Sequence, residues 1–218
     1  MKNPLKIKIC GVKEGHIIDF INHYPIAFIG FIFVKNSPRY ITPKAAQIIS
    51  QSLAKNIKKV AVTANASAAE CELIRRDFKP DLWQFHGQED DLLIEHIRQQ
   101  MPVIRALPLA SKKDLSKLDE LAQNSDYLLF DSKLEGQKIH GGTGQSFDWR
   151  LLDQLSLNSQ WFLSGGLAID NITAALKQTK AKMIDISSGL ESKKGVKEQA
   201  KIKQFIEFLQ ESYELNYA

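Results

Sequence analysis

Residues 5–11 read LKIKICG, a short β-branched run that ends in a cysteine and a glycine. Runs of four to eight residues of this kind are typical of buried β-strands. Seven further runs follow at regular intervals along the chain, and most of them end in a polar or glycine-rich motif. The eight predicted strands are Leu5–Cys10, Ala27–Phe33, Ile57–Thr63, Asp81–His86, Pro102–Leu107, Asp126–Asp131, Trp161–Gly165 and Met183–Ser187.

Helix signals lie between these strands. Thr42 followed by Pro43 predicts an N-cap with proline at the first helical position. Ser67 followed by Glu70 predicts a capping box. Further N-caps are predicted at Ser111, Asp148 and Asp170, and further helices over Glu14–Tyr24 and Val196–Ser212, the latter burying Ile202, Phe205, Ile206 and Leu209.

Eight β-then-α units within 218 residues predict an α/β protein with a single-domain (β/α)8 barrel, residues 1–218. An open doubly wound sheet also alternates strands with helices. We favour the barrel because the count is eight and because motifs recur at many strand ends, whereas one crevice in an open sheet needs only one or two. No linker or low-complexity segment suggests a second domain.

Composition limits the classes of partner. Hydrophobic residues make up 44% of the chain and charged residues 25%, as in soluble globular proteins. The longest apolar stretch, Pro25–Val34, is too short to span a bilayer, and the N-terminus lacks a signal-peptide pattern, so we expect a cytoplasmic protein without a membrane partner. The net charge of +4 is spread along the chain, which disfavours nucleic acid and suits an anionic small molecule.

The two cysteines, Cys10 and Cys71, do not form a disulfide framework. No Cys/His cluster has the spacing of a zinc site, so we expect no metal. The sequence leaves the oligomeric state open between a monomer and a homodimer.

Side chains alternate along a strand, which predicts the polarity of the barrel interior. In the first strand Ile7 and Ile9 share the face that helices would cover, so Lys8 and Cys10 point inward. The same counting places Arg105 and Asp185 inside, and Gln84 on one face with His86. Buried charges need partners, so Lys8 and Asp185 could pair where the eighth strand meets the first. Solvation of both at a strand end is an equal alternative.

Cys10 differs from an ordinary buried cysteine in its position. A lone cysteine is more often a small hydrophobe, which is the better interpretation of Cys71. Cys10 ends a strand, precedes a glycine and shares a face with Lys8. A nearby cation and an open barrel mouth favour the thiolate, which can act as a general base or a nucleophile.

Asp131 ends the sixth strand and is a candidate general acid. A partly desolvated aspartate has a raised pKa, although strand-end aspartates are often only turn formers. The following loop, Ser132–Phe147, is long for a connection of this kind. Gly142, in the run Gly141–Gly144, is a candidate hinge for a lid over bound substrate, the alternative being an ordinary surface loop.

Two further side chains are candidates for substrate binding. Arg39 follows Ser37-Pro38, and its fork could hold a carboxylate in a bidentate manner, although most loop arginines are solvated. His86 lies at a strand end, and the alternation of side chains points it into the barrel. It could donate a hydrogen bond to substrate, and a purely structural role is an equal alternative.

Glycine-rich turns follow the last two strands. Gly165 and Gly166 follow the seventh strand, and Ser188 and Gly189 follow the eighth. In many barrels these two loops hold a phosphate through backbone N–H groups. The pair of turns therefore predicts a phosphorylated small-molecule substrate.

The ordered set of motifs resembles the phosphoribosylanthranilate isomerases of tryptophan biosynthesis. The matching motifs run in the order of that family from residue 8 to residue 191, nearly the whole chain. They are Lys8-Ile9-Cys10-Gly11, Ser37-Pro38-Arg39, Gln84-Phe85-His86-Gly87, Phe130-Asp131-Ser132, Gly141-Gly142-Thr143-Gly144, Phe147-Asp148-Trp149, Ser164-Gly165-Gly166-Leu167 and Asp185-Ile186-Ser187-Ser188-Gly189-Leu190-Glu191.

This resemblance implies an Amadori rearrangement that needs no cofactor. It assigns Asp131 as the general acid at the furanose ring oxygen and Cys10 as the general base at C2. It also assigns Arg39 to the anthranilate carboxylate and Asp185 to the ribose hydroxyls or the barrel interior. The phosphate would lie at Gly165, Gly166, Ser188 and Gly189.

Three other functions remain as alternatives. The related isomerase of histidine biosynthesis has an acid where this chain has Cys10. A Schiff-base aldolase would use a barrel lysine, for which Lys8 is the candidate. A barrel that binds phosphosugars without turnover would not need Cys10 and Asp131 together.

Overall fold

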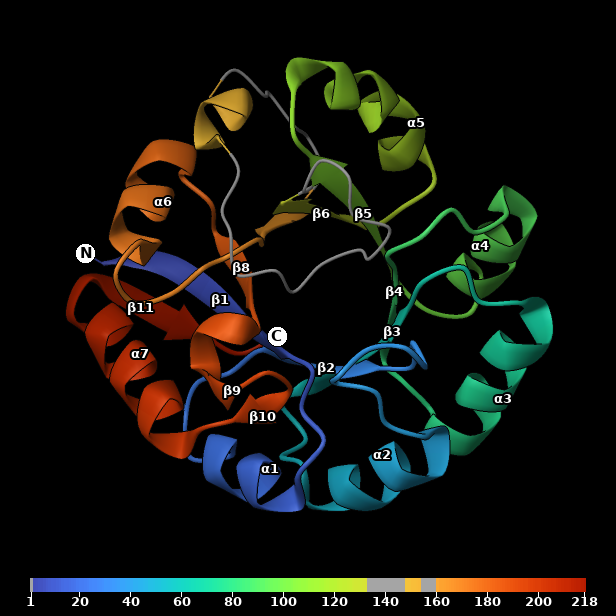
Figure 1. The fold of residues 1–218 in the computed structure, drawn as a ribbon, viewed down its shortest axis with the longest axis horizontal. Helices are drawn as coiled ribbons and strands as arrows, with labels where there is room; N and C mark the ends of the chain where they lie inside the picture. Colours follow the sequence, from blue (N-terminus) through green and yellow to red (C-terminus); the bar gives the residue numbers. More distant parts are fainter. Residues whose placement is uncertain (1, 133–147, 154–159) are drawn as a thin grey trace.

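The computed structural model describes residues 2–132, 148–153 and 160–218. Eight parallel strands follow one another around a closed barrel, and β1 pairs with β8, which an open sheet would not allow. The predicted (β/α)8 architecture is therefore confirmed (Figure 1). The strands are β1 (Asn3–Cys10), β2 (Phe28–Ile32), β3 (Lys58–Thr63), β4 (Leu82–Phe85), β5 (Val103–Leu109), β6 (Tyr127–Ser132), β7 (Gln160–Leu163) and β8 (Met183–Ile186).

Helices surround the barrel on its outside (Figure 1). In the described part of the chain, the connection between β6 and β7 contains only the 3-10 helix η3. The α-helices are α1 (Gly15–Ile21), α2 (Pro43–Ile49), α3 (Ala68–Phe78), α4 (Asp91–Arg98), α5 (Leu118–Gln123), α6 (Ile172–Thr179) and α7 (Gln199–Ser212). The 3-10 helices are η1 (Ser50–Ser52), η2 (Lys112–Lys117), η3 (Trp149–Leu152) and η4 (Ser188–Leu190).

Most of the predicted N-caps are confirmed. Thr42 accepts from the backbone of α2, and Ser67 forms the full capping box of α3. Ser111 and Asp148 begin 3-10 helices rather than α-helices. The N-cap prediction at Asp170 is wrong, because α6 starts one residue later, after Asn171. The Asn171 side chain bridges the preceding loop, accepting from Ala168 N and donating to Gly166 O, so its geometry decides where α6 begins.

Three short strands were not predicted. The hairpin of β9 (Glu191–Lys193) and β10 (Val196–Lys197) follows β8, so the last helix starts at Gln199 and not at Val196. β11 (Tyr213–Asn216) runs parallel to the first half of β1. The predicted buried face of the last helix is confirmed, since Ile202, Phe205, Ile206 and Leu209 are all buried.

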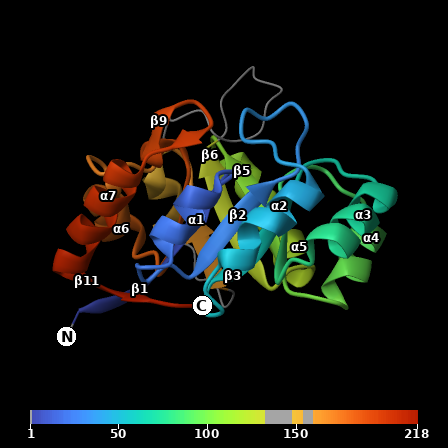
Figure 2. The same ribbon diagram turned by 90° about the horizontal axis from the view of Figure 1, so that it is seen from below.

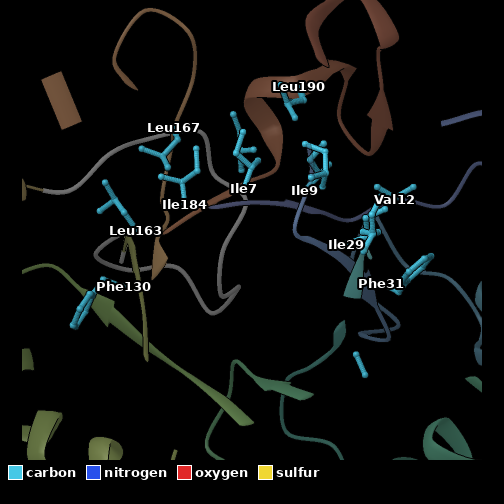
Figure 3. Close-up of a cluster of buried hydrophobic side chains, with 14 of the residues drawn as sticks. Ile7, Ile9, Val12, Ile29, Phe31, Phe130, Leu163, Leu167, Ile184 and Leu190 are labelled. Atoms are coloured by element: carbon cyan, nitrogen blue, oxygen red, sulfur yellow. The ribbon is translucent and has the colours of Figure 1, made fainter. Parts of the chain in front are cut away.

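The apolar core has two layers, separated by the strands. Strand side chains such as Ile7, Ile9 and Phe31, which Figure 3 labels, belong to the outer layer together with buried side chains of the helices. The inner layer fills the barrel, where Phe28 and Phe162 meet with ring centroids 5.4 Å apart. Burying each of these side chains contributes about 1.5–3 kcal/mol to stability. The outward phase predicted for Ile7 and Ile9 is confirmed.

The inward position predicted for Arg105 is wrong. Ile104 and Ala106 are the β5 side chains inside the barrel, so Arg105 lies in the outer layer. There its Nη1 lies 3.4 Å from Asp91 Oδ1 on α4. A strand that is buried on both faces lacks the alternation of polar and apolar residues that would reveal its phase.

Candidate functional site

The candidate residues gather at one end of the barrel. Figure 2 shows the loop after β2 and the β9–β10 hairpin at the end opposite to the two chain termini. This is the carboxyl end of the parallel strands, where β1 finishes at Cys10 and β6 carries Asp131 near its end. In (β/α)8 barrels, active sites lie at this end.

Lys8 and Asp185 form an ion pair inside the barrel. The two residues stand opposite each other in the β1–β8 register, and the Nζ–Oδ1 distance is 2.9 Å. The predicted pair is therefore confirmed, and the solvated alternative is wrong because Lys8 is fully buried. Burial by itself lowers the pKa of Lys8, but Asp185 and Cys10 hold it above its usual 10.5. Burial also raises the pKa of Asp185, and Lys8 opposes that effect.

Cys10 lies beside this pair. A Cβ atom added at Gly30 of β2 would lie 2.8 Å from Cys10 Sγ and 3.1 Å from Lys8 Nζ, so the thiol and the ammonium converge over this glycine. Burial raises the pKa of the Cys10 thiol above 9.0, and Lys8 and Lys197 only partly counteract it. Our expectation of a stabilised thiolate is therefore wrong for the free protein, since desolvation outweighs the nearby cations.

Asp131 and His86 approach each other from β6 and from the end of β4. Asp131 is buried, its Oδ1 accepts from Ser132 N at 2.8 Å, and its Oδ2 lies 3.2 Å from His86 Nε2. This last contact is within ion-pair distance but is not aligned as a hydrogen bond in the described structure. The predicted common face of Gln84 and His86 is confirmed, with 3.1 Å between Gln84 Nε2 and His86 Nδ1.

Arg39 is neither solvated nor unpaired. Its side chain lies over Gly11, where an added Cβ would come within 2.5 Å of Arg39 Cδ. Its Nε and Nη2 donate to Oε1 and Oε2 of Glu191 at 2.6 and 2.9 Å. The guanidinium fork therefore binds a carboxylate in the bidentate manner that we predicted, but this carboxylate is the side chain of Glu191 and not a substrate group. Nη1 is the nitrogen that Glu191 does not engage.

Glu191 is held by donors from three residues. In addition to Arg39, it accepts from Gly195 N at 3.0 Å and from Lys197 Nζ at 2.8 Å. Burial raises the pKa of Glu191, but Arg39 and Lys197 outweigh burial and lower it to about 2. Glu191 is therefore a carboxylate at neutral pH.

The glycine-rich turns after β7 and β8 lie against each other. Gly165 and Gly166 have φ values of +88° and +60°, which favour glycine. A Cβ on Gly189 would lie 2.2 Å from Leu167 O, so the η4 turn and the β7 loop pack at backbone distance. Gly165 also lies next to the acid, since its Cβ position is 3.1 Å from Asp131 Oδ1. The candidate phosphate turns are thus adjacent to Asp131.

One predicted site residue, Gly142, lies outside the described residues, as does most of its loop. Three buried polar residues near the site were not predicted as functional: Gln84, Glu191 and Lys197. Gln84 and Glu191 lie in motifs already quoted, and the inward phase of Gln84 was a usable signal. No local pattern marks Lys197, because an unpredicted hairpin brings it to the site.

Comparisons with known proteins agree with this geometry. The family model for N-(5'-phosphoribosyl)anthranilate isomerase matches residues 7–208. A relative of that name from Rhizobium leguminosarum bv. trifolii is 38% identical over 209 residues, covering 94% of each chain. Another from Rhodopseudomonas palustris is 36% identical over 206 residues, covering 93% of this chain and 94% of the relative.

Solved structures give the same result. The phosphoribosyl anthranilate isomerase of Thermotoga maritima has a TM-score of 0.85 and 28% identity, covering 95% of this chain and 99% of the other. A second isomerase structure has a TM-score of 0.80 and 26% identity over the same shares, and holds reduced 1-(o-carboxyphenylamino)-1-deoxyribulose 5-phosphate. This chain belongs to the N-(5'-phosphoribosyl)anthranilate isomerase family.

Proposed function

We propose that this chain isomerises N-(5'-phosphoribosyl)anthranilate to 1-(2-carboxyphenylamino)-1-deoxyribulose 5-phosphate, with Asp131 as general acid and Cys10 as general base. The observation that carries the proposal is that both groups lie at the same mouth of the barrel, Cys10 at the end of β1 and Asp131 near the end of β6. Cys10 lies beside the Lys8–Asp185 pair, and Asp131 Oδ2 lies 3.2 Å from His86 Nε2. An acid and a base therefore share one barrel mouth.

In the first step, Asp131 gives its proton to the furanose ring oxygen. The C1–O bond breaks, and the nitrogen lone pair forms the Schiff base. Asp131 is buried at the barrel mouth, and its Oδ1 accepts from Ser132 N, which fixes the position of the carboxyl group. His86 lies beside its second oxygen, where it can orient the carboxyl toward the ring oxygen.

In the second step, Cys10 takes the proton from C2 and an enolamine forms. The enolamine then tautomerises to the ketone, so no electrons are exchanged with a carrier. Before this step the Cys10 thiol gives its own proton to solvent water, and Lys8 next to the sulfur is the group that stabilises the thiolate. The deprotonated base is a minor form in the free protein, since burial raises the pKa of the thiol.

The two anionic ends of the substrate would bind on either side of these groups. The turns at Gly165–Gly166 and Ser188–Gly189 suit the phosphate, because glycine allows backbone N–H groups to approach it closely. Arg39 suits the anthranilate carboxylate through Nη1, the guanidinium nitrogen that Glu191 does not bind. Asp185 supports the interior, because its Oδ1 is already bound to Lys8.

The same geometry argues against a Schiff-base aldolase. The candidate amine, Lys8, is fully buried and donates to Asp185, with a pKa above its usual value. A protonated amine is not a nucleophile. Borohydride with substrate should therefore leave Lys8 unmodified, and a trapped adduct would revive that alternative.

Turnover of freshly prepared substrate tests the proposal. Fluorescence loss follows the isomerisation, and released anthranilate reports spontaneous hydrolysis. Wild-type protein should convert substrate without releasing anthranilate, and Asp131→Asn should abolish conversion while the exposed Asp153→Asn, in the same connection, should not. Equal rates in Asp131→Asn and wild type would remove Asp131 as the acid.

We also propose that the enzyme works in the cytoplasm, on a small phosphorylated substrate, as a monomer or a homodimer. In the described residues, no helix is long and apolar enough to cross a membrane. A solved relative from Thermotoga maritima is described as dimeric. Light scattering in solution decides between the two oligomeric states.

A further inference from the structure

Three buried ionisable side chains meet beside the candidate site: Arg39, Glu191 and Lys197 are 4%, 7% and 3% exposed. Arg39 Nε and Lys197 Nζ donate to the same oxygen, Glu191 Oε1, at 2.6 and 2.8 Å. Two cations therefore share one anion. Buried charges are normally balanced, so this three-residue cluster is unusual in carrying a net charge of one sign.

The hydrogen bonds show that Lys197 is an ammonium. Its Nζ also lies 3.0 Å from Ser187 O and 3.3 Å from Ser187 Oγ. The Ser187 hydroxyl gives its own proton to Cys10 O, so toward Lys197 it can only accept. Three acceptors around one nitrogen require three protons, and a neutral amine has two. Burial and the charge of Arg39 lower the pKa of Lys197 below its usual 10.5, and Glu191 and Cys10 only partly oppose them.

Glu191 is ionised for the complementary reason. Arg39 supplies two donors, and Lys197 and Gly195 supply one each, so both oxygens accept two hydrogen bonds. The guanidinium of Arg39 is always charged. The cluster thus has two positive charges and one negative charge.

In the part of the chain that the structure describes, the neighbouring charges do not cancel the excess. Asp185 is committed to Lys8, and the Cys10 thiol is neutral in the free protein because burial raises its pKa. A buried positive charge remains at the rim, linked to the Cys10 backbone through Ser187. An anion brought there by a ligand would complete the balance.

We propose that Lys197 is a positioning residue for the ring carboxylate of the substrate. Glu191 orients the Arg39 fork but would also cancel its charge, and Lys197 offsets Glu191 so that Arg39 still attracts the carboxylate. This inference rests on the proposed binding of that carboxylate by Arg39. The β9–β10 hairpin is the element that supplies Lys197 and so makes the cluster possible.

The test compares two ligands. One is reduced 1-(o-carboxyphenylamino)-1-deoxyribulose 5-phosphate, and the other is the same compound without the ring carboxylate. Calorimetry gives the Kd of each for wild type, Lys197→Met and the double variant Lys197→Met/Glu191→Gln. Lys201→Met is the matched control, because Lys201 contacts only the backbone oxygen of Glu191 and the exposed Glu198 in the described structure.

Lys197→Met makes the cluster neutral. We expect it to weaken the binding of the carboxylate ligand about tenfold, the scale of one charge acting across roughly 10 Å at an effective dielectric of about 20. The ligand without carboxylate should bind as it does to wild type. In turnover, KM should rise with kcat nearly unchanged. The double variant has a net charge of +1 again and should bind the carboxylate ligand more tightly than Lys197→Met does.

A purely structural role predicts the opposite pattern. Lys197→Met would then weaken both ligands equally, and the double variant would bind worse than the single one; either result overturns the inference. Lys197→Gln keeps a donor toward Glu191 without a charge and provides the same comparison if the Met variant does not fold. Wild type that binds both ligands equally would instead overturn the carboxylate assignment itself.

Discussion

Glu191 should make the folded protein sensitive to acid in a defined pH window. Its pKa falls from 4.5 to about 2 on folding, because Arg39 and Lys197 outweigh the effect of burial. A folded-state pKa below the unfolded one stabilises the protein above pH 4.5, and this stabilisation is lost as the pH falls toward 2. At about 1.4 kcal/mol per pKa unit, the carboxylate contributes about 3 kcal/mol at pH 7 and about half of that at pH 3.

Urea unfolding between pH 7 and pH 3 measures this contribution. Glu191→Gln has no carboxylate to protonate, so the difference in unfolding free energy between wild type and this variant should shrink by about 2 kcal/mol over that range. Glu72→Gln is the control, since Glu72 is exposed and its ion pair among the described residues is with Arg75 on the surface of α3. Its difference from wild type should stay nearly constant over this range, because solvent screens an exposed pair.

Parallel curves for wild type and Glu191→Gln would refute the reasoning. They would mean that Glu191 has the same pKa in the folded and unfolded chains. Its four hydrogen-bond donors would then stabilise the ionised carboxylate no more than water does. In that case the net charge assigned to the buried cluster would also need revision.

Three further outcomes are expected. Cys10→Ala should lower kcat by on the order of a hundred- to ten-thousandfold with little change in KM, while Cys71→Ala should leave kcat unchanged. In wild type, kcat/KM should rise with pH up to and beyond 9, because burial raises the pKa of the Cys10 thiol. A pH profile of kcat/KM that is flat from pH 7 to 10 would contradict this. Arg39→Ala should raise KM about ten- to a hundredfold, whereas Arg150→Ala, at an exposed surface pair, should leave it unchanged. Gly30→Ala should destabilise the fold by about 1–3 kcal/mol in urea unfolding, because its methyl group meets Cys10 Sγ at 2.8 Å, and equal stability would show that Cys10 can move away.

Local patterns carried the prediction of the barrel. Strand runs such as Leu5–Cys10 and caps such as Thr42 and Ser67 depend on contacts within a few residues, and the structure confirms them. The phase of the first strand was also readable, because Ile7 and Ile9 alternate with two lysines. The phase of β5 was not, because its neighbours are apolar on both faces and Arg105 gave a misleading signal.

The candidate site divides in the same way. The sequence alone determined the kinds of group present, namely a thiol, an acid, an arginine and two glycine-rich turns at the ends of strands. Only the tertiary structure decided their states. The closure of β1 on β8 pairs Lys8 with Asp185, and burial raises the pKa of Cys10. An unpredicted hairpin brings Glu191 and Lys197 to Arg39. The pairs Lys8–Asp185 and Arg39–Glu191 join residues more than a hundred positions apart, and no pattern of neighbouring residues predicts which distant groups will meet or how deeply they will be buried.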